Sequence, residues 1–174
     1  MDLADILSEK SIKPKEKTEI ISNMIVSGGL SFNELITYAK KSKDSVKATC
    51  IEAIEFSSKT NPEIVNEEGF DFVTESLASN APRVKWEAAK VIGNCVSQFQ
   101  GSLDMVIDSL LTNSKDSGTV VRWSVAYALG EIVKLKTDYN NDLIPKIIKI
   151  HDEEVKNSIK KIYANALKKA GIKV

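Results

Sequence analysis

Apolar side chains recur along this chain at the three- and four-residue spacing of a helix and do not alternate as in a strand. Val121, Val125, Ala128, Leu129 and Ile132 fall at i, i+4, i+7, i+8 and i+11 and form one apolar face. Shorter apolar helices are predicted just before such stretches, at residues 31–41, 69–79, 103–113 and 140–151. Polar breaks divide the pairs at residues 42–44, 80–82, 114–118 and 152–153. The pattern predicts a recurring helix–turn–helix unit.

A ten-residue motif supports this repeat. Residues 84–93 read VKWEAAKVIG, and residues 121–130, which begin 37 positions later, read VRWSVAYALG. Six positions match in the two copies: valine, a basic residue, tryptophan, alanine, Ile or Leu, and glycine. Weaker copies are predicted to begin at Val46 and Val155, with Glu55 and Ala164 where the glycine is expected. A further degenerate unit is predicted near the N-terminus.

One helical pair cannot bury its apolar face alone, whereas stacked pairs form a continuous core. We therefore predict an all-α fold, an α–α superhelix of about five helical hairpins in a single domain. Its units are expected at roughly residues 2–28, 31–60, 62–100, 102–137 and 140–171. Pro82 suits the first turn of a helix, where a backbone donor is not needed. Gly93 and Gly130 lie mid-helix, where glycine costs roughly 1 kcal/mol relative to alanine, so close helix packing is expected there.

The run Val-[Lys/Arg]-x-x-Ala-Ala-x-x-Leu-Gly resembles the second helix of a HEAT repeat. The match lies in residues 84–93 and 121–130 and extends loosely over most of residues 31–171. Asp116 stands where that family often places an acid in the turn between its helices. The resemblance implies a right-handed superhelix whose second helices line the concave side, and a usual role in protein–protein scaffolding. A fold does not by itself fix a function.

The two tryptophans occupy the same position in the two clear motif copies. On a helical wheel of about 100° per residue, Trp86 and Trp123 lie almost opposite the core face and border a polar stripe. One interpretation is an aromatic binding patch on the concave face, since Trp, Tyr and Arg are enriched in binding hot spots. The candidate site residues are Trp86, Lys90, Asn94, Arg122, Trp123, Tyr127 and Glu131. The alternative is that each indole wedges between neighbouring second helices, beside Gly93 or Gly130.

Composition narrows the classes of function. The 174 residues contain 24 Lys+Arg and 24 Asp+Glu, so bulk charge does not favour nucleic acid or a membrane surface as a partner. The first residues do not resemble a secretory signal, and the chain contains no apolar stretch of membrane-spanning length. With two cysteines, a disulfide framework is not indicated. We expect a reduced, soluble, cytoplasmic protein.

Few residues are candidates for chemistry. His151 is the single histidine, and it is more consistent with a helix end than with a metal or acid–base site beside Asp152. Cys50 and Cys95 fall on core faces and are expected to be buried, inert thiols. The lysines of the last unit are expected to form a solvated capping face, with a nucleic-acid patch as the alternative. No catalytic residue, metal or cofactor is predicted.

The sequence therefore favours a non-catalytic scaffold that binds a protein or peptide on its concave face. An alternative is a HEAT-like DNA glycosylase for alkylated bases, or another nucleic-acid-binding repeat protein. Such an enzyme would require Glu87 or Glu131 to supply its acid. A lyase-type HEAT protein that handles bilin chromophores is a third, weaker alternative.

Overall fold

The computed structural model describes residues 2–101 and 103–173, which form ten α-helices and two short 3₁₀ helices and contain no strand. The first helices of the pairs are α1 (Leu3–Ser8), α3 (Phe32–Lys40), α5 (Glu67–Ser76), α7 (Asp104–Asn113) and α9 (Asn140–Glu153). The second helices are α2 (Pro14–Val26), α4 (Asp44–Thr60), α6 (Pro82–Cys95), α8 (Thr119–Lys134) and α10 (Asn157–Lys169). The 3₁₀ helices are η1 (Pro62–Ile64) and η2 (Val96–Gln98). The all-α prediction is confirmed.

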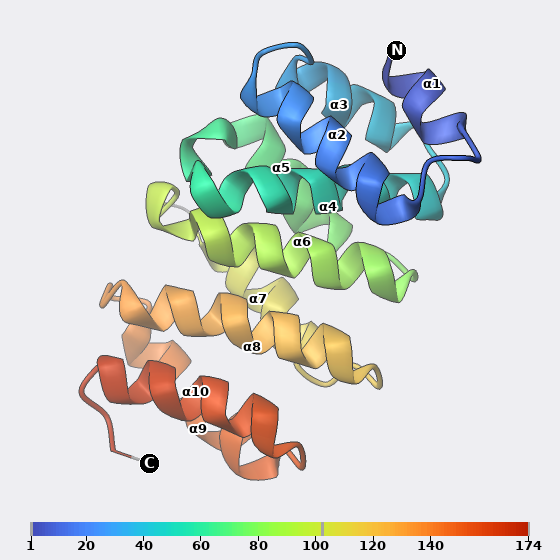
Figure 1. The fold of residues 1–174 in the computed structure, drawn as a ribbon. Helices are drawn as coiled ribbons and strands as arrows, with labels where there is room; N and C mark the ends of the chain where they lie inside the picture. Colours follow the sequence, from blue (N-terminus) through green and yellow to red (C-terminus); the bar gives the residue numbers. More distant parts are fainter. Residues whose placement is uncertain (1, 102, 174) are drawn as a thin grey trace.

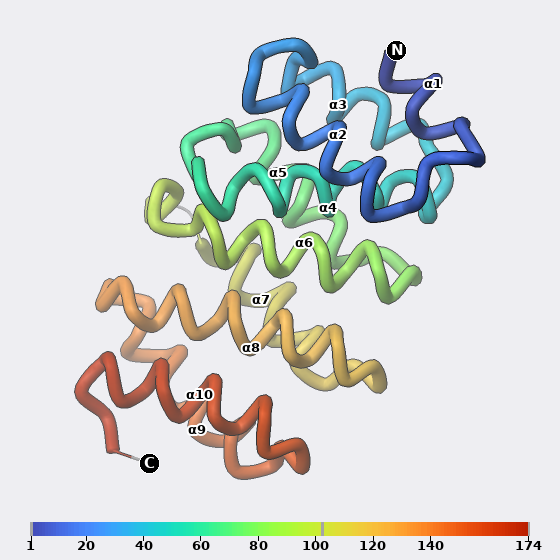
Figure 2. The backbone as a smooth tube through the Cα atoms, viewed as in Figure 1, coloured from blue at the N-terminus to red at the C-terminus, as the bar shows by residue number. Residues whose placement is uncertain are grey.

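The helices form two layers. The second helices stack side by side in chain order at the front of Figure 1, with α3, α5, α7 and α9 behind them and the short α1 beside α2. The backbone passes back and forth between the two layers (Figure 2). The most extensive helix contacts join successive second helices, from α2 to α10. The chain is therefore a superhelix of five helical hairpins, as predicted.

The apolar faces of the two layers enclose one elongated core. Val84, Ala88, Val121 and Leu129 are fully buried in it. Pro82 is the first residue of α6, as predicted. None of the described helices is long and apolar enough to cross a membrane.

The mid-helix glycines provide space for the neighbouring second helix. A Cβ atom on Gly93 would lie 2.4 Å from Cε1 of the Tyr127 ring. A Cβ on Gly130 would lie 3.2 Å from the Cβ of Ala166. The predicted packing requirement at these two glycines is confirmed, because a side chain at either position would collide with or crowd the next repeat.

The motif copy predicted to begin at Val155 is wrong. Val155 precedes α10 and is 81% exposed, whereas Ile159, the third residue of that helix, is fully buried. Val46, Val84 and Val121 are likewise the third residues of their helices. The repeat spacing becomes 38, 37 and 38 residues. The pair Val155-Lys156 imitates the motif, but it lies in the turn that follows α9.

Candidate functional site

A pocket of about 310 Å³ opens on the second-helix layer, across α4, α6 and α8. It is lined by Glu55, Ser58, Lys59, Lys90, Asn94, Trp123 and Tyr127. We call it the central hollow. Four of the seven predicted site residues meet here, namely Lys90, Asn94, Trp123 and Tyr127. The repeat brings them together because neighbouring second helices lie side by side and these positions are not in the core.

Two aromatic rings from α8 form one wall of the central hollow. Trp123 and Tyr127, one helical turn apart, stack with ring centroids 6.3 Å apart and an interplanar angle of 21°. The Trp123 residue remains 42% exposed, while Tyr127 is half-buried against Gly93. A large aromatic surface held by its neighbours and open to solvent is typical of a binding anchor.

Asn94 links the three helices by hydrogen bonds. The Tyr127 hydroxyl donates to Asn94 Oδ1 at 2.8 Å. Asn94 Nδ2 in turn donates to the Glu55 carbonyl oxygen at 3.2 Å and to Ser58 Oγ at 3.0 Å. Burial, together with the negative charges of Glu131 and Glu55, raises the pKa of Tyr127 to about 12. The hydroxyl therefore remains a donor at neutral pH, and this wall of the hollow is held in place.

The opposite side of the hollow contains a buried carboxylate. The Glu55 side chain is 1% exposed, and Lys59 Nζ lies 2.8 Å from its Oε1. Its Oε2 has no hydrogen-bond partner, and Lys90 Nζ lies 3.8 Å away. The ammonium group of Lys90 is closer to Oε2 of Glu87, at 2.8 Å. Among the lining residues the Glu55 carboxylate thus lies near the ammonium groups of Lys59 and Lys90, and Lys90 also pairs with the buried Glu87, which does not itself line the hollow.

Trp86 does not join the aromatic wall. Its indole packs half-buried against the core, and Nε1 donates to Oε1 of the buried Glu87 at 2.7 Å. In the next repeat Ser124 replaces Glu87 and provides no comparable acceptor. The two indoles therefore differ in exposure: Trp86 is half-buried and hydrogen-bonded, whereas Trp123 is 42% exposed, and the space beside Gly93 is filled by Tyr127.

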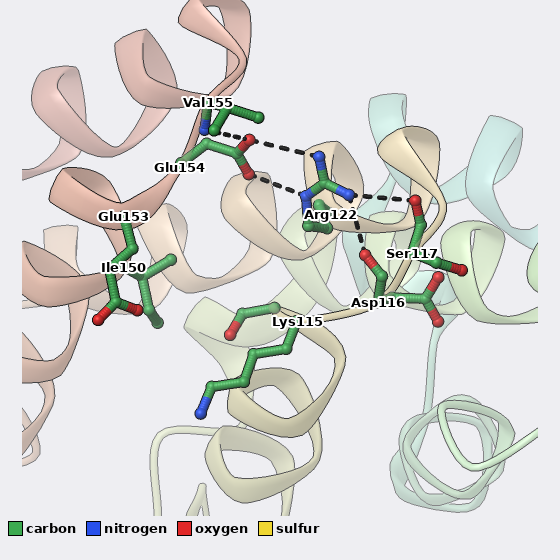
Figure 3. Close-up of a pocket in the computed structure, with 9 residues that line it drawn as sticks. Lys115, Asp116, Ser117, Arg122, Ile150, Glu153, Glu154 and Val155 are labelled. Carbon is green, nitrogen blue, oxygen red and sulfur yellow. Dashed lines mark hydrogen bonds and ion pairs between the residues drawn. The ribbon is translucent and has the colours of Figure 1, made fainter.

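Arg122 lies apart from the central hollow, at a pocket of about 380 Å³ beside the α7–α8 and α9–α10 turns (Figure 3). Its Nε and Nη2 donate to the Glu154 carboxylate at 2.9 and 3.3 Å. Its Nη1 donates to the carbonyl oxygens of Asp116 and Ser117, as Figure 3 shows. These bonds use the guanidinium group to join two repeats, so we assign Arg122 a structural role.

An equivalent ion pair occurs one repeat earlier. Lys85, which follows the first motif residue as Arg122 does, lies 2.8 Å from Oδ2 of Asp116. Asp116 precedes Val121 by five positions, as Glu154 precedes Ile159. Each motif base therefore binds the acid before the next second helix, and we call these two pairs the turn ladder. The ladder explains the base in the motif and the acid at Asp116.

Both ladder acids are kept ionised. The hydrogen bond from Lys85 is the largest of the effects that lower the pKa of Asp116. Burial raises the pKa of Glu154, but hydrogen bonds from Arg122 and from the backbone N–H groups of Lys156 and Val155 outweigh it and lower the pKa overall. The ladder is therefore an ion-pair system at neutral pH.

The last predicted site residue, Glu131, lies one turn beyond Tyr127 and pairs with Lys134. Glu131 does not line the central hollow. Its negative charge contributes to the raised pKa of Tyr127.

The other candidates for chemistry lie outside the hollow. Cys50 and Cys95 are fully buried free thiols, and burial raises the pKa of both to about 12, which confirms their predicted inert character. His151 lies in the last turn of α9, with Nδ1 3.0 Å from Oδ1 of Asp152. Over residues 2–101 and 103–173 no group of three or more His, Cys, Asp or Glu side chains could hold a metal ion.

Three residues that line the central hollow were not predicted from the sequence to belong to the site. Glu55, Ser58 and Lys59 all come from α4, whose copy of the motif is weak. Glu55 is visible in the sequence as a departure from glycine. That departure is the one signal that could have placed α4 in the site.

Neither the family models nor the curated proteins include a match to this chain. Solved structures do match over nearly its whole length. A designed armadillo repeat protein in complex with the peptide (KR)4 is 16% identical, with a TM-score of 0.70, 96% of this chain covered and 79% of that chain. Computationally designed armadillo repeat proteins for modular peptide recognition are 15% identical, with a TM-score of 0.73 over 96% of this chain and 80% of that one. A third designed armadillo repeat protein, YIII(Dq)4CqI, is 16% identical, with a TM-score of 0.75 over 97% and 80%. The fold is that of an armadillo-like helical repeat solenoid.

Proposed function

We propose that this protein is a non-catalytic scaffold that binds an extended peptide segment across the second-helix layer. One side chain of the peptide would stack on Trp123 and Tyr127 in the central hollow. The observation that carries the proposal is the exposed Trp123 indole, which is fixed by stacking at the edge of a pocket built from three repeats. Of the seven predicted site residues, the proposal keeps the four that line this hollow, and it adds Glu55, Ser58 and Lys59.

The shape of the site favours an extended chain over a compact ligand. The lining residues come from successive second helices, which pack about 8–10 Å apart in general, and an extended chain advances about 3.3 Å per residue. A few residues of peptide would therefore span one repeat. The names of the designed neighbours, one in complex with (KR)4 and others made for modular peptide recognition, give further support.

The proposal is tested with a displayed library of random dodecapeptides selected on the wild-type protein. We expect enriched peptides whose affinity for Trp123→Ala is about tenfold weaker or more, as for a binding hot spot. The control is Met105→Ala, which removes a 73% exposed side chain from α7 in the other layer. Selected peptides that bind Trp123→Ala as tightly as wild type would refute the proposal.

A further inference from the structure

A second hollow, of about 600 Å³, lies on the same layer between α8 and α10. It is lined by Lys134, Ile162, Asn165, Lys168 and Lys169. We call it the distal hollow. From the sequence, the lysines of this unit are expected to form a solvated face or a basic patch.

The corrected repeat register relates the two hollows. Lys134 follows Lys59 by 75 residues, Asn165 follows Lys90 by 75, and Lys169 follows Asn94 by 75. This separation is two repeats, so equivalent positions of the helices line both hollows. These three positions of the distal hollow therefore repeat positions of the central hollow two units further along the layer, while the aromatic wall has no counterpart among the distal lining residues.

The charge of the distal hollow is nevertheless different. The one lining acid of the central hollow, Glu55, corresponds to Gly130, and Glu87, the buried partner of Lys90, corresponds to Ile162. Lys134 pairs with Glu131. Among residues 2–101 and 103–173, no carboxylate lies within 4.0 Å of the ammonium group of Lys168 or Lys169. The lining of the distal hollow thus contains three lysines and no carboxylate, and with only Lys134 paired, to Glu131, this site carries net positive charge.

We propose that the distal hollow binds an acidic side chain of the same peptide segment that occupies the central hollow, an inference that rests on the proposed function. Two interaxial distances separate equivalent points of the hollows, about 16–20 Å. An extended peptide covers that distance in about five or six residues. The structure thus assigns the partner a class: a peptide with one side chain in the central hollow and an acidic residue about five or six positions away.

The observations favour an acidic peptide over a nucleic acid. A nucleic-acid backbone presents negative charge at every nucleotide and is bound by a continuous track of bases. Here the central hollow contains the Glu55 carboxylate beside its two lysines, whereas the distal hollow is lined by three lysines and no carboxylate. One or two acidic groups match this arrangement better than a polyanion does.

The direct test uses octaglutamate as the probe and the full chain at low salt, followed by amide chemical shifts. We expect saturable shifts at residues 165–169 and an affinity about fivefold weaker for Lys168→Ala/Lys169→Ala. The control, Lys146→Ala/Lys149→Ala, removes the same charge from α9 in the other layer and should leave the affinity unchanged. The absence of shifts in α10, or equal weakening by both double variants, would overturn the proposal.

A second test separates this proposal from the proposed function. The dodecapeptide selection is repeated on Lys168→Glu/Lys169→Glu, with folding checked by far-ultraviolet circular dichroism. We expect acidic residues five or six positions from the anchor with wild type, and basic residues there with the variant. Peptides that depend on Trp123 but show no such reversal would overturn the acidic subsite and leave the proposed function intact. Tighter, lysine-dependent binding of a single-stranded oligonucleotide than of octaglutamate would also overturn it, in favour of nucleic acid.

Discussion

At the scale of single residues, the residue that follows each tryptophan distinguishes an indole that packs against the protein from one that is exposed to solvent. Trp86 and Trp123 occupy the same motif position, yet the first donates to the buried Glu87 and the second is followed by Ser124. The sequence therefore predicts where on the helix both indoles lie. It does not predict their different exposure, because that depends on a side-chain hydrogen bond formed only in the folded chain.

Fluorescence can measure this difference. Trp86→Phe leaves Trp123 as the single indole, and Trp123→Phe leaves Trp86. We expect acrylamide to quench Trp86→Phe more steeply, with emission at longer wavelength, because Trp123 is 42% exposed. Equal quenching of the two variants, with both folded by circular dichroism, would contradict the assignment and remove the aromatic wall of the central hollow.

Gly93 offers a second prediction at this scale. Gly93→Ala should lower the free energy of unfolding by about 1–3 kcal/mol, because the new Cβ would lie 2.4 Å from the Tyr127 ring. The steric strain outweighs the higher helix propensity of alanine, which by itself would stabilise the variant by about 1 kcal/mol. Urea unfolding measures the change. The matched control is the same substitution in a Tyr127→Ala background, where relief of the clash should make alanine neutral or stabilising. A loss of the same size in both backgrounds would show that the ring is not the cause.

At the scale of helices, periodicity predicted most of the elements, and its error in the last repeat has a physical cause. Val155 and Lys156 have the same residue types as the first two motif positions. The Glu154 carboxylate, however, binds Arg122 and also accepts hydrogen bonds from the backbone N–H groups of Val155 and Lys156. These bonds fix an extended turn, and α10 begins only at Asn157. The motif pattern alone does not distinguish Val155 from Ile159, because the burial of each residue depends on where the turn between α9 and α10 ends.

The turn ladder predicts how stability depends on pH. Asp116 and Glu154 have pKa values below the ordinary 3.8 and 4.5 of their residue types. Their stabilisation is therefore fully present above about pH 4.5 and is lost as the pH falls through the lower folded-state values. Asp116→Asn/Glu154→Gln should lower the stability at pH 7 by about 1–2 kcal/mol and flatten its decline below pH 4.5.

Urea unfolding between pH 7 and pH 2 measures this effect. The control is Glu63→Gln/Asp71→Asn, which removes the same charge at exposed positions outside the ladder. We expect the control to keep the wild-type slope. A wild-type slope in the ladder variant would mean that these ion pairs do not couple the repeats.

At the scale of the whole molecule, the stacked hairpins follow from the repeat, whereas the two hollows do not. A hollow requires the relative rotation and spacing of successive second helices, and no single helix specifies these. The buried Glu55 shows why, since its side chain lies within reach of Lys90 from the next repeat. Once the register is fixed at Ile159, however, the 75-residue correspondence of the hollows can be found in the sequence alone.

The solenoid also predicts where the chain opens first. Stability in a repeat array is approximately a sum over repeats and their nearest-neighbour interfaces. Helices α6 and α8 each pack between two second helices, whereas α1, of six residues, contacts mainly α2. Hydrogen exchange followed by mass spectrometry should therefore be slowest in α6 and α8 and fastest in α1. Gly93→Ala weakens the α6–α8 interface and should accelerate exchange in those two helices more than in α2. Uniform acceleration along the chain would instead show that the repeats open as a single unit and that the nearest-neighbour description fails here.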